Sequence, residues 1–230
     1  MKLTLRALAA LLDYPTAELQ AHIGEVRSAL HEEAVLPRTV LERLEPLLRS
    51  FETQELLDVQ IAYSALFDQT RSLSLHLFEH VHGEGRERGQ AMIDLGEQYI
   101  ARGFLIEGRE LPDFLPMFLE FLSYQPPAEI RDWLGQPAHV LTVLEQRLAE
   151  RDTPYAAIFQ GLLNIANVQP DPEAVAELQE RIRQKESKSI DQEWEDAPVD
   201  FTAPMQESGA PGVIAKLKAA RDAISTAIKG

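Results

Sequence analysis

Cysteine is absent from the 230 residues of this chain. Its absence excludes disulfide bonds, thiolate zinc sites, iron–sulfur ligation by this chain and cysteine nucleophiles. Long apolar runs are absent too, since no segment reaches the ~18 consecutive apolar residues of a membrane span. The opening MKLTLRALAALLDYP is too short and too soon interrupted for a secretory signal, so we expect a cytoplasmic protein.

Basic residues are scarce. The chain has 22 Lys and Arg against 37 Asp and Glu, which gives a net charge of −15. Such a field repels phosphate backbones and favours basic partners, so we expect no nucleic acid binding. The last thirty residues differ, because four basic residues there outnumber two acidic ones.

Strand signals are lacking as well, because apolar residues recur at helical rather than alternating spacing along most of the chain. One clear stripe, entered through Pro37, consists of Val40, Leu41, Leu44, Leu47, Leu48 and Phe51. We therefore predict an all-α fold. It comprises a compact helical-bundle domain over residues 1–186, an acidic disordered linker over 187–211 and a basic amphipathic tail helix over 212–230.

The predicted tail helix combines an apolar stripe with Lys and Arg flanks, while the predicted domain is acidic. A coil-like tether of ~25 residues reaches roughly 25 to 30 Å. One hypothesis is that the tail acts as an internal competitor for a basic, amphipathic ligand. The alternative is a tail that packs as one more helix or stays disordered.

The stretch HLFEHVHGEGRERG, residues 76–89, contains the pattern H-x-x-E-H at His76, Glu79 and His80. On a helix, two histidines four residues apart can supply two zinc ligands, and the glutamate can activate water. The alternative is a packed helix, ended by Gly83, whose histidines pair with nearby carboxylates. Short motifs often match by chance, which favours the packed helix.

A second informative stretch is RELPDFLPMFLEFLSYQPP, residues 109–127. With Asp113 as N-cap, a helix would run to about Tyr124 before Pro126 and Pro127 stop it. Only Glu120 and Ser123 are polar along it, which is typical of a central helix. The other interpretation is a helix whose extra face, rich in Met and aromatic residues, lines a groove for a bound peptide.

Neither a nucleophilic triad nor a glycine-rich phosphate loop stands out, so we do not expect an enzyme and expect no bound metal or cofactor. Two other possibilities stay open. One is a zinc-dependent hydrolase that uses His76, Glu79 and His80, and the other is a plain helical scaffold.

Three segments carry a family resemblance: LLDYP at residues 11–15, YSALFDQTRSLSLHLFEHVHGEGRERGQAMIDL at 63–95, and RELPDFLPMFLEFLS at 109–123. Together they resemble the NarJ-type assembly chaperones of respiratory nitrate reductase, also called delta subunits, over roughly residues 1–170. The resemblance implies an all-helical cytoplasmic chaperone. Such a chaperone binds the N-terminal leader of the catalytic subunit, supports molybdenum cofactor insertion and prevents premature membrane docking.

The same resemblance suggests where a leader would bind. Nine residues that match the family pattern are expected in or beside the binding surface: Tyr63, Phe67, Phe78, Glu79, His80, Met92, Asp113, Leu115 and Glu120. In this interpretation the histidine motif belongs to a scaffold and not to a hydrolase.

Overall fold

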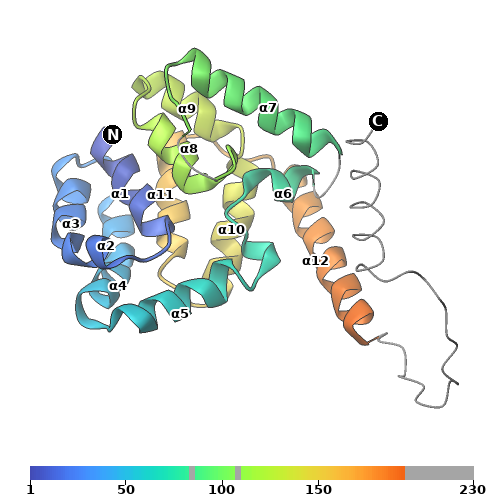
Figure 1. Cartoon of the computed structure of the whole chain (residues 1–230), viewed down its shortest axis with the longest axis horizontal. Coiled ribbons are helices and arrows are strands. Elements are labelled where there is room, and N and C mark those ends of the chain that lie inside the picture. The colour runs from blue at the N-terminus through green and yellow to red at the C-terminus, as the bar shows by residue number, and fades with distance from the viewer. Residues whose placement is uncertain (83–85, 107–109, 195–230) are drawn as a thin grey trace, which may run out of the picture. The chain divides into compact units, whose positions relative to one another are not determined.

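The computed structural model describes residues 1–82, 86–106 and 110–194, and the all-α prediction is confirmed. These residues form twelve α-helices and one 3-10 turn, η1 (Figure 1). The elements are α1 (Lys2–Leu12), α2 (Ala17–Ala21), α3 (Ile23–Glu32), α4 (Arg38–Thr53), α5 (Leu56–Phe67), η1 (Arg71–Leu73), α6 (Leu77–His82), α7 (Arg86–Ala101), α8 (Leu115–Leu122), α9 (Pro127–Gly135), α10 (Ala138–Glu150), α11 (Ala156–Ala166) and α12 (Pro172–Trp194).

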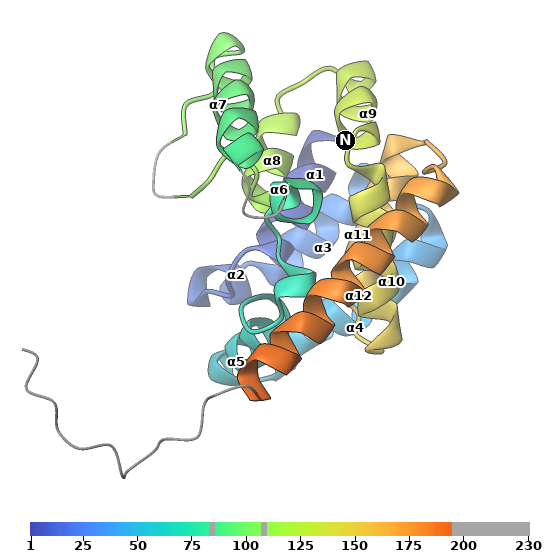
Figure 2. The same ribbon diagram turned by 90° about the vertical axis from the view of Figure 1, so that its right-hand side faces the viewer.

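Helix α8 is central, as its composition predicted. Leu115, Leu119, Phe121 and Leu122 are fully buried, and α1 packs along the helix (Figures 1 and 2). The ring of Phe121 also contacts Trp133 of α9 and Tyr99 of α7, with centroids 5.4 and 4.4 Å apart. The core around α8 therefore joins helices from both halves of the chain.

A second packing group joins α11 to α4, α9 and α10. The predicted stripe of α4 is largely confirmed, since Val40, Leu44 and Phe51 are buried. Gly161 of α11 lets the two helices approach closely. A Cβ atom added there would lie 3.2 Å from Leu36 Cδ2, immediately before α4.

The start of α1 is held by a carboxylate from the end of α3. Glu33 accepts hydrogen bonds from the backbone amides of Leu3 and Thr4 at 3.0 and 2.8 Å, and from the Thr4 hydroxyl at 2.8 Å. It also pairs with the amino group of Met1 at 2.6 Å. Glu33 thus satisfies free amides in the first turn of α1, as a local N-cap would.

Two details of the predicted helix around residue 115 are wrong. Asp113 is not its N-cap, because α8 begins at Leu115 with Phe114 in the cap position and ends at Leu122 rather than Tyr124. The Asp113 carboxylate is engaged elsewhere, with the segment before α6 and the first turn of α6. Pro116 lies in the first turn of α8, where its missing amide hydrogen costs no helical hydrogen bond.

The chain comprises two compact units, Met1–Asp191 and Gln192–Gly230. Helix α12 continues to Trp194, so residues 187–194 of the predicted linker are helical. The rest of that linker, the predicted tail helix and the Gly83 cap lie outside the described residues, and the predicted domain boundaries stay predictions. Among the helices of the described ranges, none is long and apolar enough to cross a membrane.

Candidate peptide-binding groove

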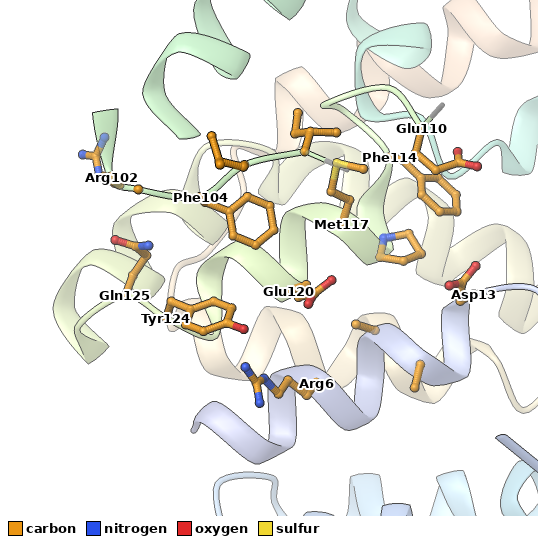
Figure 3. A pocket seen from close by; sticks show the side chains of 16 residues that line it. Arg6, Asp13, Arg102, Phe104, Glu110, Phe114, Met117, Glu120, Tyr124 and Gln125 are labelled. Atoms are coloured by element: carbon orange, nitrogen blue, oxygen red, sulfur yellow. The ribbon is translucent and has the colours of Figure 1, made fainter. Parts of the chain in front are cut away.

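A groove of about 990 Å³ lies between α1, residues 102–106 and the exposed side of α8 (Figure 3). Its apolar lining includes Phe104, Leu105, Phe114 and Met117. Leu105 is 68% exposed, so most of its side chain remains available for contact. A concave site that combines apolar walls with a few charged groups is suited to hold a ligand.

The walls of the groove follow from the local sequence. Helix α1 packs its leucines against α8 and leaves Ala9 and Ala10 at the groove, so the wall is low there. The segment from Gly103 to Ile106 turns away from α7 because Gly103 adopts a φ of +75°. Phe104 then packs on Phe121 with centroids 5.7 Å apart, which places Leu105 at the rim.

The two ends of the groove carry opposite charges (Figure 3). Asp13 and Glu110 lie at one end, and Arg6 and Arg102 line the other. The Arg6 guanidinium lies 4.7 Å from the ring centroid of Tyr124 and its Nε donates to Ser123 Oγ at 3.2 Å. The groove therefore presents charged groups beside an apolar floor, rather than one uniform potential.

A partly buried ionic cluster lies around Asp113, next to Phe114 of the groove lining. The fully buried Asp113 carboxylate accepts from the Phe78 amide at 3.1 Å and pairs with His76 Nδ1 at 3.1 Å. Arg88 of α7 lies 3.7 Å from Asp113 Oδ2 and 3.2 Å from Glu79 Oε1. The hydrogen bond to Asp113 raises the pKa of His76 above its ordinary value. The cluster ties α6 and α7 to the residue pair that precedes α8.

The histidine motif does not have the geometry of a zinc site. His76 lies before α6, where it forms an isolated antiparallel bridge with Phe114, so it does not share a helical face with His80. The buried Nε2 of His80 lies 2.8 Å from the Ser74 carbonyl, and burial lowers the pKa of His80. Over the part of the chain that the structure describes, no three His, Asp or Glu side chains gather as metal ligands.

The nine residues predicted for the binding surface occupy different places. Only Glu120 lines the groove. Tyr63, Phe67 and Leu115 are core residues, and His80 and Asp113 are buried polar groups. Phe78, Glu79 and Met92 are partly buried on α6 and α7. Most of the predicted set therefore does not line this groove, and its place in or beside a binding surface stays a prediction.

Sequence reasoning missed the contribution of α1 and of the segment before the second motif. Arg6, Phe104 and Leu105 were not among the predicted residues, although Met117 and Phe114 lay on the predicted aromatic face. One signal was present, since GFLI at residues 103–106 is an apolar run that directly follows a glycine. An apolar loop in an acidic chain indicates a contact surface.

The model of the family described as "Nitrate reductase delta subunit" matches residues 12–160. The chain belongs to this family. It is 42% identical over 194 residues to the nitrate reductase molybdenum cofactor assembly chaperone NarJ of Escherichia coli K12, an alignment that covers 84% of this chain and 82% of the relative.

Two further relatives of this family agree. The probable assembly chaperone NarW of Escherichia coli K12 is 34% identical over 202 residues, covering 86% of this chain and 83% of the relative. The probable chaperone NarJ of Bacillus subtilis is 30% identical over 165 residues, covering 70% and 87%. The delta-subunit family is one of assembly chaperones, which confirms the prediction that this chain is not an enzyme.

Proposed function

We propose that this delta-subunit family member is an assembly chaperone that binds the N-terminal leader of the nitrate reductase catalytic subunit in the groove between α1 and α8. The proposal includes support of molybdenum cofactor insertion before membrane docking, in the cytoplasm. Its relatives are named molybdenum cofactor assembly chaperones of nitrate reductase. The observation that carries it is the exposed apolar groove, with Leu105 68% exposed at its rim.

The size and chemistry of the groove fit such a leader. Residues 6–13, in α1 and at its C-cap, form one wall, so at 1.5 Å per residue the wall is about 10 Å long. That length accommodates about two turns of a ligand helix. The apolar floor suits the apolar face of an amphipathic helix, and Asp13, Glu110 and Glu120 offer carboxylates to its basic residues.

A matched pair of leucine variants tests the proposal by isothermal titration with a synthetic leader. Leu105 and Leu57 are 68% and 65% exposed, but Leu57 lies on α5 and does not line the groove. Since burying a leucine contributes about 1.5 to 3 kcal/mol, Leu105→Gln is expected to weaken binding roughly tenfold or more. Leu57→Gln should leave affinity unchanged. Equal affinities of the native protein and Leu105→Gln would contradict the groove as the site, and absence of any leader binding would favour a plain scaffold.

Salt dependence provides a second measurement of the same proposal. If basic leader residues face Asp13, Glu110 and Glu120, the affinity should fall as salt rises, because exposed charges are screened over about 10 Å at ~0.1 M. Affinity that ignores salt would show that the contact is apolar alone.

A further inference from the structure

We propose that the leader binds as a helix antiparallel to α1, with its N-terminus between Asp13 and Glu110 and its C-terminal end beside Lys2, Arg6 and Arg102. This inference rests on the proposed function and adds the direction of the ligand. It starts from the separation of charge along the groove, which Figure 3 shows from Arg6 and Arg102 at one end to Asp13 and Glu110 at the other.

The cationic end is a built surface. The Arg6 guanidinium and the Lys2 ammonium lie 4.7 and 5.4 Å from the centroid of the Tyr124 ring, which is 54% exposed. Among the described residues, neither cation has a carboxylate partner within 4.0 Å. Arg102 also lines this end of the groove and forms an ion pair with Glu129, with Nε and Oε2 3.5 Å apart. Lys2 and Arg6 therefore both lie over one aromatic ring, without a neighbouring carboxylate in the described part of the chain to neutralise them.

The charged side chains of α1 itself lie in the order opposite to the one that favours its dipole, although Glu33 at the end of α3 supplies a carboxylate to its first turn. A helix is stabilised by acidic groups at its N-terminus and basic groups at its C-terminus. Helix α1 has Lys2 and Arg6 in its first half, no acidic residue in its first turn and Asp13 at its C-cap. Local stability does not explain this order. Charges that violate a local rule are expected where they serve a ligand.

A leader helix has a dipole, so it matches the basic and acidic ends of the groove in one direction only. Its free amino group and its helix N-terminus are both positive, and both are attracted by Asp13 and Glu110. Its C-terminal end carries the negative pole of the helix dipole, which Lys2, Arg6 and Arg102 attract. The reverse direction places like charges together at both ends. Because the wall is about 10 Å long, the two directions put the ligand termini at different places.

The lack of cysteine makes the direction measurable, since one introduced cysteine carries a spin label at a single place. Ala17 and Ala128 are exposed and do not line the groove. Ala17 follows Asp13 at the acidic end, and Ala128 lies next to Glu129 near the basic end. Ala17→Cys and Ala128→Cys are therefore matched variants for distance measurements to a nitroxide at residue 2 or at residue 12 of a synthetic leader.

The expected result is that the label at residue 2 lies nearer to position 17 and the label at residue 12 nearer to position 128. Acetylating the leader amino group should also weaken binding about two- to fivefold, the size of a terminal dipole interaction. That effect should vanish in the double variant Asp13→Asn, Glu110→Gln. Reversed or equal distances with intact binding in the titration would overturn the direction and leave the proposed function standing. Loss of binding in the titration of the unlabelled native protein would overturn both.

Discussion

Asp113→Asn is the most informative single change, because the carboxylate joins three elements without being exposed. Asparagine keeps the volume but removes the charge that faces His76 and Arg88, at 3.1 and 3.7 Å. A hydrogen bond to a charged group contributes about 1.5 to 3 kcal/mol, and Arg88 keeps Glu79 as a partner. We expect the free energy of unfolding to fall by about 2 to 3 kcal/mol. The measurement is a urea titration followed by circular dichroism, in which the slope of free energy against urea concentration should stay unchanged.

The control is Asp132→Asn, an exposed aspartate on α9 for which we expect a change within about 0.5 kcal/mol. The native protein and both variants should be measured in the same buffer near pH 7. A loss below about 0.5 kcal/mol for Asp113→Asn would refute the reasoning, because the buried carboxylate would then not hold α6 and α7 to α8.

Four other changes test the fold. Glu33→Gln should destabilise the protein by about 1 to 2 kcal/mol at neutral pH. Despite partial burial, the hydrogen bonds to Met1, Thr4 and Leu3 lower the pKa of Glu33 from 4.5 to about 2. The difference in unfolding free energy between the native protein and Glu33→Gln should therefore shrink as the pH falls from 4.5 to about 2. His76→Gln should lower the free energy of unfolding more at pH 5.5 than at pH 8.5. Because the pKa of His76 is raised, its protonated ring stabilises the fold below about pH 6.5, and this stabilisation is lost as the pH rises. His80→Gln should show the opposite trend, because burial lowers the pKa of His80 and the stability that the neutral ring contributes is lost as the pH falls below about 6.5. The same pH trend for both histidine variants would contradict these two pKa shifts. Gly161→Val should lower the thermal midpoint through an overpacking cost of about 1 to 3 kcal/mol, since its Cβ would lie 3.2 Å from Leu36 Cδ2.

The helices and the central position of α8 could be predicted because each depends on periodicity within a short segment. The burial of Phe51 on α4 and of Phe121 on α8 follows directly from such spacing. The groove could not be predicted in this way. Its walls come from residues near 6, 104 and 117, and only the tertiary packing of α1 against α8 brings them together.

The histidine motif shows a different reason for error. The spacing of His76 and His80 indicates one helical face only if both residues are helical. His76 instead pairs with Phe114, because the Leu77 amide donates to the Asp113 carbonyl at 3.0 Å and the Leu115 amide donates to the Leu75 carbonyl at 2.9 Å. A partner 38 residues away thus decides the local structure, and no window around His76 contains that information.

This bridge between residues 75–77 and 113–115 also brings two segments that are far apart in the sequence to the same place. Between them, Leu95 and Tyr99 of α7 belong to the core, and the Tyr99 hydroxyl donates a 2.8 Å hydrogen bond to the Pro112 carbonyl. Phe104 packs on Phe121 of α8, so a change at position 104 would disturb this core, whereas Leu105 is 68% exposed and can change without touching it. The rim of the groove can therefore be altered at one position by substitution while the scaffold beneath keeps its packing.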